Sequence, residues 1–95
     1  MTIPPAAAMP APIHVLFVLL QDSLILDWAG PAEALRMANH ALAAQGLPPR
    51  FELHFVGPQT ESVSSVGVRL SGLAPLPAML PAPAWVVLVG QPGRR

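Results

Sequence analysis

An uninterrupted apolar run over residues 14–20, HVLFVLL, most constrains how this chain can fold. The run is rich in branched and aromatic side chains and does not alternate with polar ones, which is typical of a strand covered on both faces. Strands of that kind occur in parallel sheets, whose connecting helices cover the faces. We therefore expect an α/β fold built around a mainly parallel sheet.

The residues after this run have the pattern of a helix. Pro31 suits a first helical position, where its missing N–H needs no partner. Leu35, Ala38 and Leu42 follow at helical spacing, and Gly46 ends the pattern. An earlier start, from about residue 23, stays open because SLILDWAG contains no breaker before its final glycine.

The rest of the chain reads as strands separated by turns. Residues 50–57 alternate and predict a strand with one less buried face, and residues 58–65 read as a polar connection. Residues 66–73 predict a short irregular strand, and the many prolines of residues 74–84 predict a loop. Residues 85–93 predict a third, central strand. Strand, helix and strand in this order predict a right-handed βαβ unit.

The composition indicates that this chain is part of a larger domain or a subunit whose faces are covered. The chain is 53% hydrophobic and 11% charged, against roughly 25% charge in an average soluble domain. Its central-looking last strand needs helices on both faces, and only one strong helix is predicted. We expect residues 1–12 to be a disordered Ala/Pro-rich leader and residues 13–95 to be the N-terminal portion of a larger domain.

Several function classes are excluded by what the chain lacks. It has no Cys and no Lys among its 95 residues, which removes thiol nucleophiles, thiolate metal sites and Schiff-base chemistry. Its net charge is zero with scattered arginines, so we expect no nucleic-acid contact by this segment. No apolar run approaches the roughly 20 residues of a membrane helix, and no dinucleotide fingerprint follows the first strand. We expect a cytoplasmic protein without membrane contact and without a cofactor.

Asp27 is the most informative candidate for chemistry. It stands near the carboxyl side of a predicted parallel strand, where open α/β sheets bind ligands, and burial near Leu26 and Trp28 would suit it to proton transfer. The alternative is a carboxylate that caps the helix or complements its dipole. Spacing alone favours the alternative.

The remaining candidates give weaker signals. Gly90, in the strand exit VGQPG, could let backbone N–H groups approach a ligand. Asp22 and Ser23 read as turn or cap residues. Histidines 14, 40 and 54 fall on different elements and are expected to point different ways, so no metal site is predicted.

The stretch VLFVLLQDSLILDWAGPAEALRMAN resembles the opening of the DJ-1/PfpI superfamily, in the branch that has D-x-x-G-P after the first strand. FELHFVGP, SSVGVRL and WVVLVGQPG follow in the order of that family, so the resemblance covers roughly residues 13–93. The branch includes isonitrile-hydratase-like enzymes and the amidase-like sensor domains of GlxA-type regulators of the AraC family.

The resemblance implies a flavodoxin-like α/β/α sandwich, as in class I glutamine amidotransferase-like proteins. It places a ligand pocket at Asp27, Trp28, Gly30 and Gly90. In the enzymes, the acidic residue at the Asp27 position pairs with a cysteine on a later elbow, and this sequence has none. The leading hypothesis is a truncated sensor and dimerisation domain of a regulator that is homo-oligomeric at full length and takes a small-molecule effector. The alternative is the front half of an isonitrile-hydratase-like or amidase-like enzyme.

Overall fold

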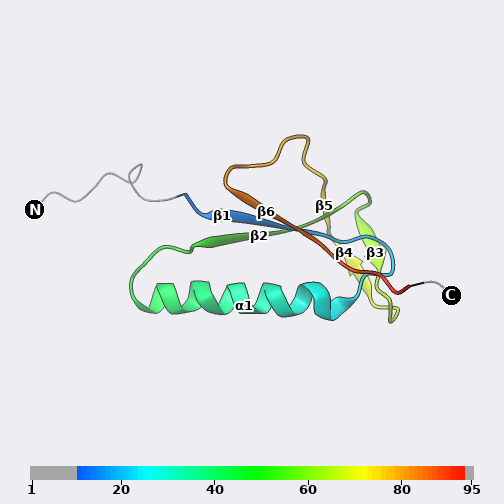
Figure 1. Cartoon of the computed structure of the whole chain (residues 1–95), viewed down its shortest axis with the longest axis horizontal. Helices are drawn as coiled ribbons and strands as arrows, with labels where there is room; N and C mark the ends of the chain where they lie inside the picture. Colours follow the sequence, from blue (N-terminus) through cyan, green and yellow to red (C-terminus); the bar gives the residue numbers. More distant parts are fainter. Residues whose placement is uncertain (1–10, 94–95) are drawn as a thin grey trace, which may run out of the picture.

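A computed structural model describes residues 11–93, which form one helix and two sheets (Figure 1). Four strands make an all-parallel sheet in the order β5-β2-β1-β6, and β3 pairs with β4 in an antiparallel hairpin. The elements are β1 (Ile13–Val18), α1 (Ile25–Ala44), β2 (Phe51–Gly57), β3 (Glu61–Val63), β4 (Arg69–Ser71), β5 (Ala74–Pro75) and β6 (Ala84–Leu88). The expected α/β class with a parallel sheet is confirmed, and the arrangement is consistent with an incomplete flavodoxin-like fold. The leader predicted over residues 1–12 falls outside the described residues except for its last two.

The first apolar run forms the interior strand β1. It pairs in parallel with β2 on one side, from Ile13↔Phe51 to Val18↔Val56, and with β6 on the other. Val15 and Phe17 are fully buried and Leu16 is 3% exposed, so both faces of the strand are covered. The prediction from the missing alternation is confirmed for β1.

Helix α1 covers one face of the sheet (Figure 1). On that face Val15, Phe17 and Ala32 form the core, with Leu35 and Phe55 packed against it. The rings of Phe17 and Phe55 stack with centroids 5.2 Å apart, which joins β1 to β2 beneath the helix. Burying each such side chain contributes about 1.5–3 kcal/mol, so this layer dominates the stability of the fold.

The helix starts earlier than its proline suggests. It begins at Ile25, after the extended N-cap residue Leu24, and Pro31 lies inside it. The prediction of Pro31 as the first helical residue is therefore wrong, and the earlier start is the one observed. Pro31 has no N–H to give to the carbonyl of Asp27, but the packing of the apolar face offsets that loss.

Asn39 ties the second half of the helix to β2. Its Nδ2 donates to the carbonyl of Phe51 at 2.8 Å, and its Oδ1 accepts from the backbone N–H of Arg50 at 3.0 Å and of Phe51 at 3.1 Å. One side chain thus satisfies three backbone groups of Arg50 and Phe51 at the start of the strand.

Three predicted segments differ from the structure. The loop predicted over residues 74–84 begins with the short strand β5, which pairs with the end of β2. The polar connection over residues 58–65 contains strand β3, whose pairing with β4 is a tertiary contact that composition does not show. Strand β6 is an edge strand in the described sheet, with Trp85 49%, Val86 45% and Leu88 79% exposed, so its predicted central position is wrong for residues 11–93. The apolar run of β6 indicates a surface that is stable only when it is buried, but it does not identify the element that buries it. Within the same residues, no helix combines the length and hydropathy needed to cross a membrane.

Candidate functional site

The candidate site lies at the carboxyl edge of the parallel sheet, where the chain passes from β1 into α1. Three backbone hydrogen bonds fix this crossing. Asp22 donates to Val63 at 2.8 Å, and Leu24 donates to Gly90 at 3.0 Å. Ser65 donates to Ser23 at 3.0 Å. The β1–α1 connection is thereby held between the hairpin and the segment that follows β6.

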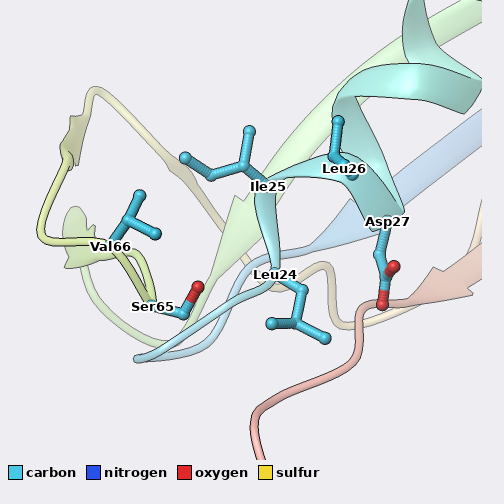
Figure 2. Close-up of a pocket in the computed structure, with 6 residues that line it drawn as sticks. All are labelled: Leu24, Ile25, Leu26, Asp27, Ser65 and Val66. Atoms are coloured by element: carbon cyan, nitrogen blue, oxygen red, sulfur yellow. The ribbon is translucent and has the colours of Figure 1, made fainter.

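Asp27 and Gly90 are in direct contact. A Cβ atom added to Gly90 would lie 2.5 Å from Asp27 Oδ2, closer than real contacts allow. Glycine is therefore needed at this position for the carboxylate to approach the backbone this closely. Figure 2 shows the Asp27 side chain directed at the chain that leaves β6. The resemblance places both residues in one ligand pocket; the structure puts them in contact, and their part in ligand binding stays a prediction.

A hollow of about 440 Å³ opens beside this contact (Figure 2). The Asp27 side chain points toward the strand exit, and Ser65 and Val66 reach the hollow from the turn between β3 and β4. Its walls are mainly aliphatic, with one carboxylate and one hydroxyl as polar groups. The lining residues are Leu24, Ile25, Leu26, Asp27, Ser65 and Val66.

The two other predicted pocket residues lie elsewhere. Trp28 packs edge-on against Phe55, with centroids 5.8 Å apart and planes at 69°, and belongs to the core under α1. Its buried Nε1 has no hydrogen-bond partner within the described residues. Gly30 is exposed, and nothing lies within 4 Å of the place where its Cβ would be. Their predicted part in ligand binding stays a prediction, and neither shares the hollow with Asp27.

Asp27 is more exposed than the sequence suggested, since burial near Leu26 and Trp28 was expected for an acid that transfers protons. The residue is exposed, and its neighbour Leu26 is 83% exposed. Asp27 occupies the first turn of α1, where a negative charge complements the helix dipole, and the N-cap position belongs to Leu24, which forms no side-chain cap. The dipole interpretation is therefore supported and the capping interpretation is wrong.

Asp22 lies in a turn with Gln21, as predicted, whereas Ser23 follows the turn and is neither part of it nor the helix cap. Asp22 has a φ of 63°, a left-handed conformation that aspartate tolerates better than most residues. The hydroxyl of Ser23 is buried without a hydrogen-bond partner in the described part of the chain. No sequence pattern pointed to Ser65 and Val66, because the hairpin reaches the hollow only through tertiary packing.

A second cluster was missed altogether. His14 and His54 were expected to point different ways, and this is wrong: their rings stack, and His14 Nδ1 lies 3.0 Å from His54 Nε2. Glu52 Oε2 lies 3.4 Å from the same Nδ1. The alternation of residues 50–57 already put Glu52 and His54 on one face, and the parallel register adds His14 from β1.

Comparisons with protein-family models, with curated proteins and with solved structures find no match for this chain. The family assignment therefore stays a proposal, supported by the sequence resemblance and by the strand order.

Proposed function

We propose that this chain is the small-molecule sensing part of a DJ-1/PfpI-like domain, of the kind that precedes the DNA-binding helices in GlxA-type regulators of the AraC family. The observation that carries the proposal is the Asp27 carboxylate, which rests on Gly90 beside an aliphatic hollow at the carboxyl edge of a parallel sheet. Open α/β sheets bind their ligands at that edge.

The composition of the site favours binding over catalysis. The chain contains no cysteine to act as the nucleophile that the related enzymes pair with this carboxylate. Among residues 11–93, the only other polar side chain lining the hollow is Ser65, an alcohol with no histidine beside it in the lining. A serine without a general base is a poor nucleophile. The hollow can hold a molecule but lacks the groups for acyl or hydration chemistry.

The same composition defines the class of ligand. Aliphatic walls suit an apolar body, and a volume of about 440 Å³ lies in the range of small-molecule sites. An ionised carboxylate only accepts hydrogen bonds and attracts positive charge. The effector is therefore a small, largely aliphatic molecule with an N–H, O–H or ammonium group directed at Asp27.

We also propose that the sheet is the beginning of a flavodoxin-like sandwich, and the strand order supports this. The order β2-β1-β6, all parallel with α1 crossing between the first two strands, is the order in which a flavodoxin-like sandwich begins. A class I glutamine amidotransferase-like sandwich has helices on both faces, and in the full-length regulator the exposed part of β6 would be covered by further chain or by a second protomer.

Nuclear magnetic resonance titration with a library of small aliphatic amines and alcohols tests this function. We expect shifts in the amide signals of Leu24, Ser65 and Val66, and loss of those shifts in Asp27→Asn. Asp22→Asn is the matched control, because it removes the same charge from an exposed turn and asparagine also tolerates its positive φ. Equal loss in both variants, or shifts confined to other parts of the protein, would contradict the proposed site.

The rival function is an isonitrile-hydratase-like or amidase-like enzyme, favoured by the same position of Asp27 at the sheet edge. It predicts turnover of an isonitrile or a primary amide by the purified chain, abolished in Asp27→Asn. We expect no turnover above the buffer rate.

A further inference from the structure

The face of the sheet opposite α1 brings together two imidazoles and a carboxylate. Alternation places His14 on that face of β1, and Glu52 and His54 on the same face of β2. In the parallel register His14 is paired with Glu52, and His54 is two residues further along the neighbouring strand. The three side chains are part-exposed, with His14 22%, His54 34% and Glu52 53% exposed.

Their ligand atoms converge on one point. His14 Nδ1 lies 3.0 Å from His54 Nε2 and 3.4 Å from Glu52 Oε2, and the second carboxylate oxygen lies 4.0 Å from His54 Nε2. Two imidazole nitrogens bound to one tetrahedral Zn²⁺ at 2.0–2.1 Å stand about 3.3 Å apart. The two ring nitrogens are about 0.3 Å closer than ligands of one tetrahedral ion, and the carboxylate is about 0.7 Å too far from His54 Nε2, so small side-chain movements bring one atom from each residue to a common ion.

We propose that His14, Glu52 and His54 bind a divalent transition-metal ion, with Zn²⁺ as its most suitable member. Imidazole nitrogens select ions of this class over Mg²⁺ and Ca²⁺, which take oxygen ligands. Two histidines and one glutamate leave a fourth position open for water or a small ligand. The site is separate from the Asp27 hollow, because it lies on the other face of the sheet, and it does not depend on the proposed sensing function.

The backbone that carries the ligands is preorganised. All three residues belong to paired strands rather than loops, so the separation of their Cβ atoms is set by the sheet. His54 also lines a hollow of about 180 Å³, with Leu16, Val56 and prolines of the β5–β6 segment on its walls.

Without metal, the same geometry is that of a hydrogen-bonded histidine pair beside a glutamate. One ring N–H then donates to the other ring nitrogen, and the cluster only stabilises the pairing of β1 with β2. The two interpretations differ in one measurable property, the saturable uptake of a metal ion.

Isothermal titration of the full 95-residue chain with Zn²⁺, in competition with a chelator of known affinity, tests the proposal. We expect one ion per chain, with affinity lowered on the order of 10- to 100-fold or more in His14→Ala and His54→Ala. His40→Ala is the matched control, because His40 is an exposed histidine of α1 outside the cluster, and it should bind as the wild type does. No saturable uptake at millimolar Zn²⁺, or equal losses in all three variants, would overturn the proposal.

A second pair of variants covers the case in which a histidine variant fails to fold. Glu52→Gln changes a half-exposed side chain and keeps its shape, and Glu61→Gln makes the same change at an equally exposed position in the hairpin, where Glu61 accepts from Arg69. We expect both to keep the wild-type circular dichroism, and only Glu52→Gln to weaken Zn²⁺ binding. If the two variants bind alike, the carboxylate is not a ligand and the three-residue site is wrong.

Discussion

The contact between Gly90 and Asp27 can be measured with a double-mutant cycle. In Gly90→Ala the new methyl carbon would stand 2.5 Å from Asp27 Oδ2, whereas ordinary contacts begin near 3.4 Å. The next atom, Leu24 Cδ1, stands at 3.4 Å and needs no displacement. The carboxylate is therefore the one group that must move.

The size of the change in unfolding free energy depends on how the Asp27 side chain moves away from the new methyl group. Its side chain is exposed, so it can turn away at the cost of a strained rotamer, about 0.5–1.5 kcal/mol, or shift the backbone at about 1–3 kcal/mol. Gly90 does not have a positive φ, so alanine also gains about 0.4–1 kcal/mol by restricting the unfolded chain. We expect Gly90→Ala to lower the free energy of unfolding by about 0.5–1 kcal/mol in the wild type.

In the Asp27→Ala background the obstructing oxygen is gone, and the same substitution should raise the free energy of unfolding by about 0.4–1 kcal/mol. The coupling energy between the two positions is then about 1–2 kcal/mol. Urea unfolding of the four proteins, followed by the fluorescence of Trp28 and Trp85, measures it. Equal effects of Gly90→Ala in the two backgrounds would show that the carboxylate does not rest on Gly90.

Three further substitutions test the fold that positions the site. Gly30→Ala should raise the free energy of unfolding by about 0.5–1 kcal/mol, because Gly30 is an exposed helix-interior residue with open space at its Cβ; a decrease would fit a helix that starts at Pro31 with Gly30 as its cap. Asn39→Ala should lower it by about 1–3 kcal/mol through the loss of three hydrogen bonds at the start of β2, measured by urea unfolding, and an unchanged midpoint would contradict that role. Phe17→Ala should lower it by about 3–5 kcal/mol, enough to broaden or abolish cooperative thermal unfolding, and a change below about 1 kcal/mol would mean that β1 is not the centre of the core.

The sequence predicts the central features of the fold because they are local. The apolar run of β1 and the alternation of β2 identify two strands, and the spacing of Leu35, Ala38 and Leu42 identifies the helix between them. The start of α1 could not be settled, because Pro31 is favourable at a first position and also tolerated inside a helix whose packing offsets the missing hydrogen bond. The edge position of β6 depends on what lies beside it, which no local pattern reports.

The contact between Asp27 and Gly90 could be anticipated from the strand order. Asp27 and Gly90 follow two parallel strands, and the carboxyl ends of such strands share one edge of the sheet. The resemblance grouped Trp28 and Gly30 with Asp27, but Trp28 points about 100° away from Asp27 around the helix and packs in the core, and Gly30 has no side chain and open space at its Cβ position. His14 and His54 meet through strand register, which becomes certain only once the pairing is known.

The central proposal is that the hollow beside Asp27 binds a small molecule without converting it. The most direct measurement is a titration of the ¹⁵N-labelled 95-residue chain with a small aliphatic amine, with the amount of unchanged amine quantified at the end. We predict amide shifts centred on Leu24, Ser65 and Val66 that disappear in Asp27→Asn and persist in Asp22→Asn, with the amine recovered intact. Shifts that survive Asp27→Asn, or consumption of the ligand by the wild type alone, would contradict it.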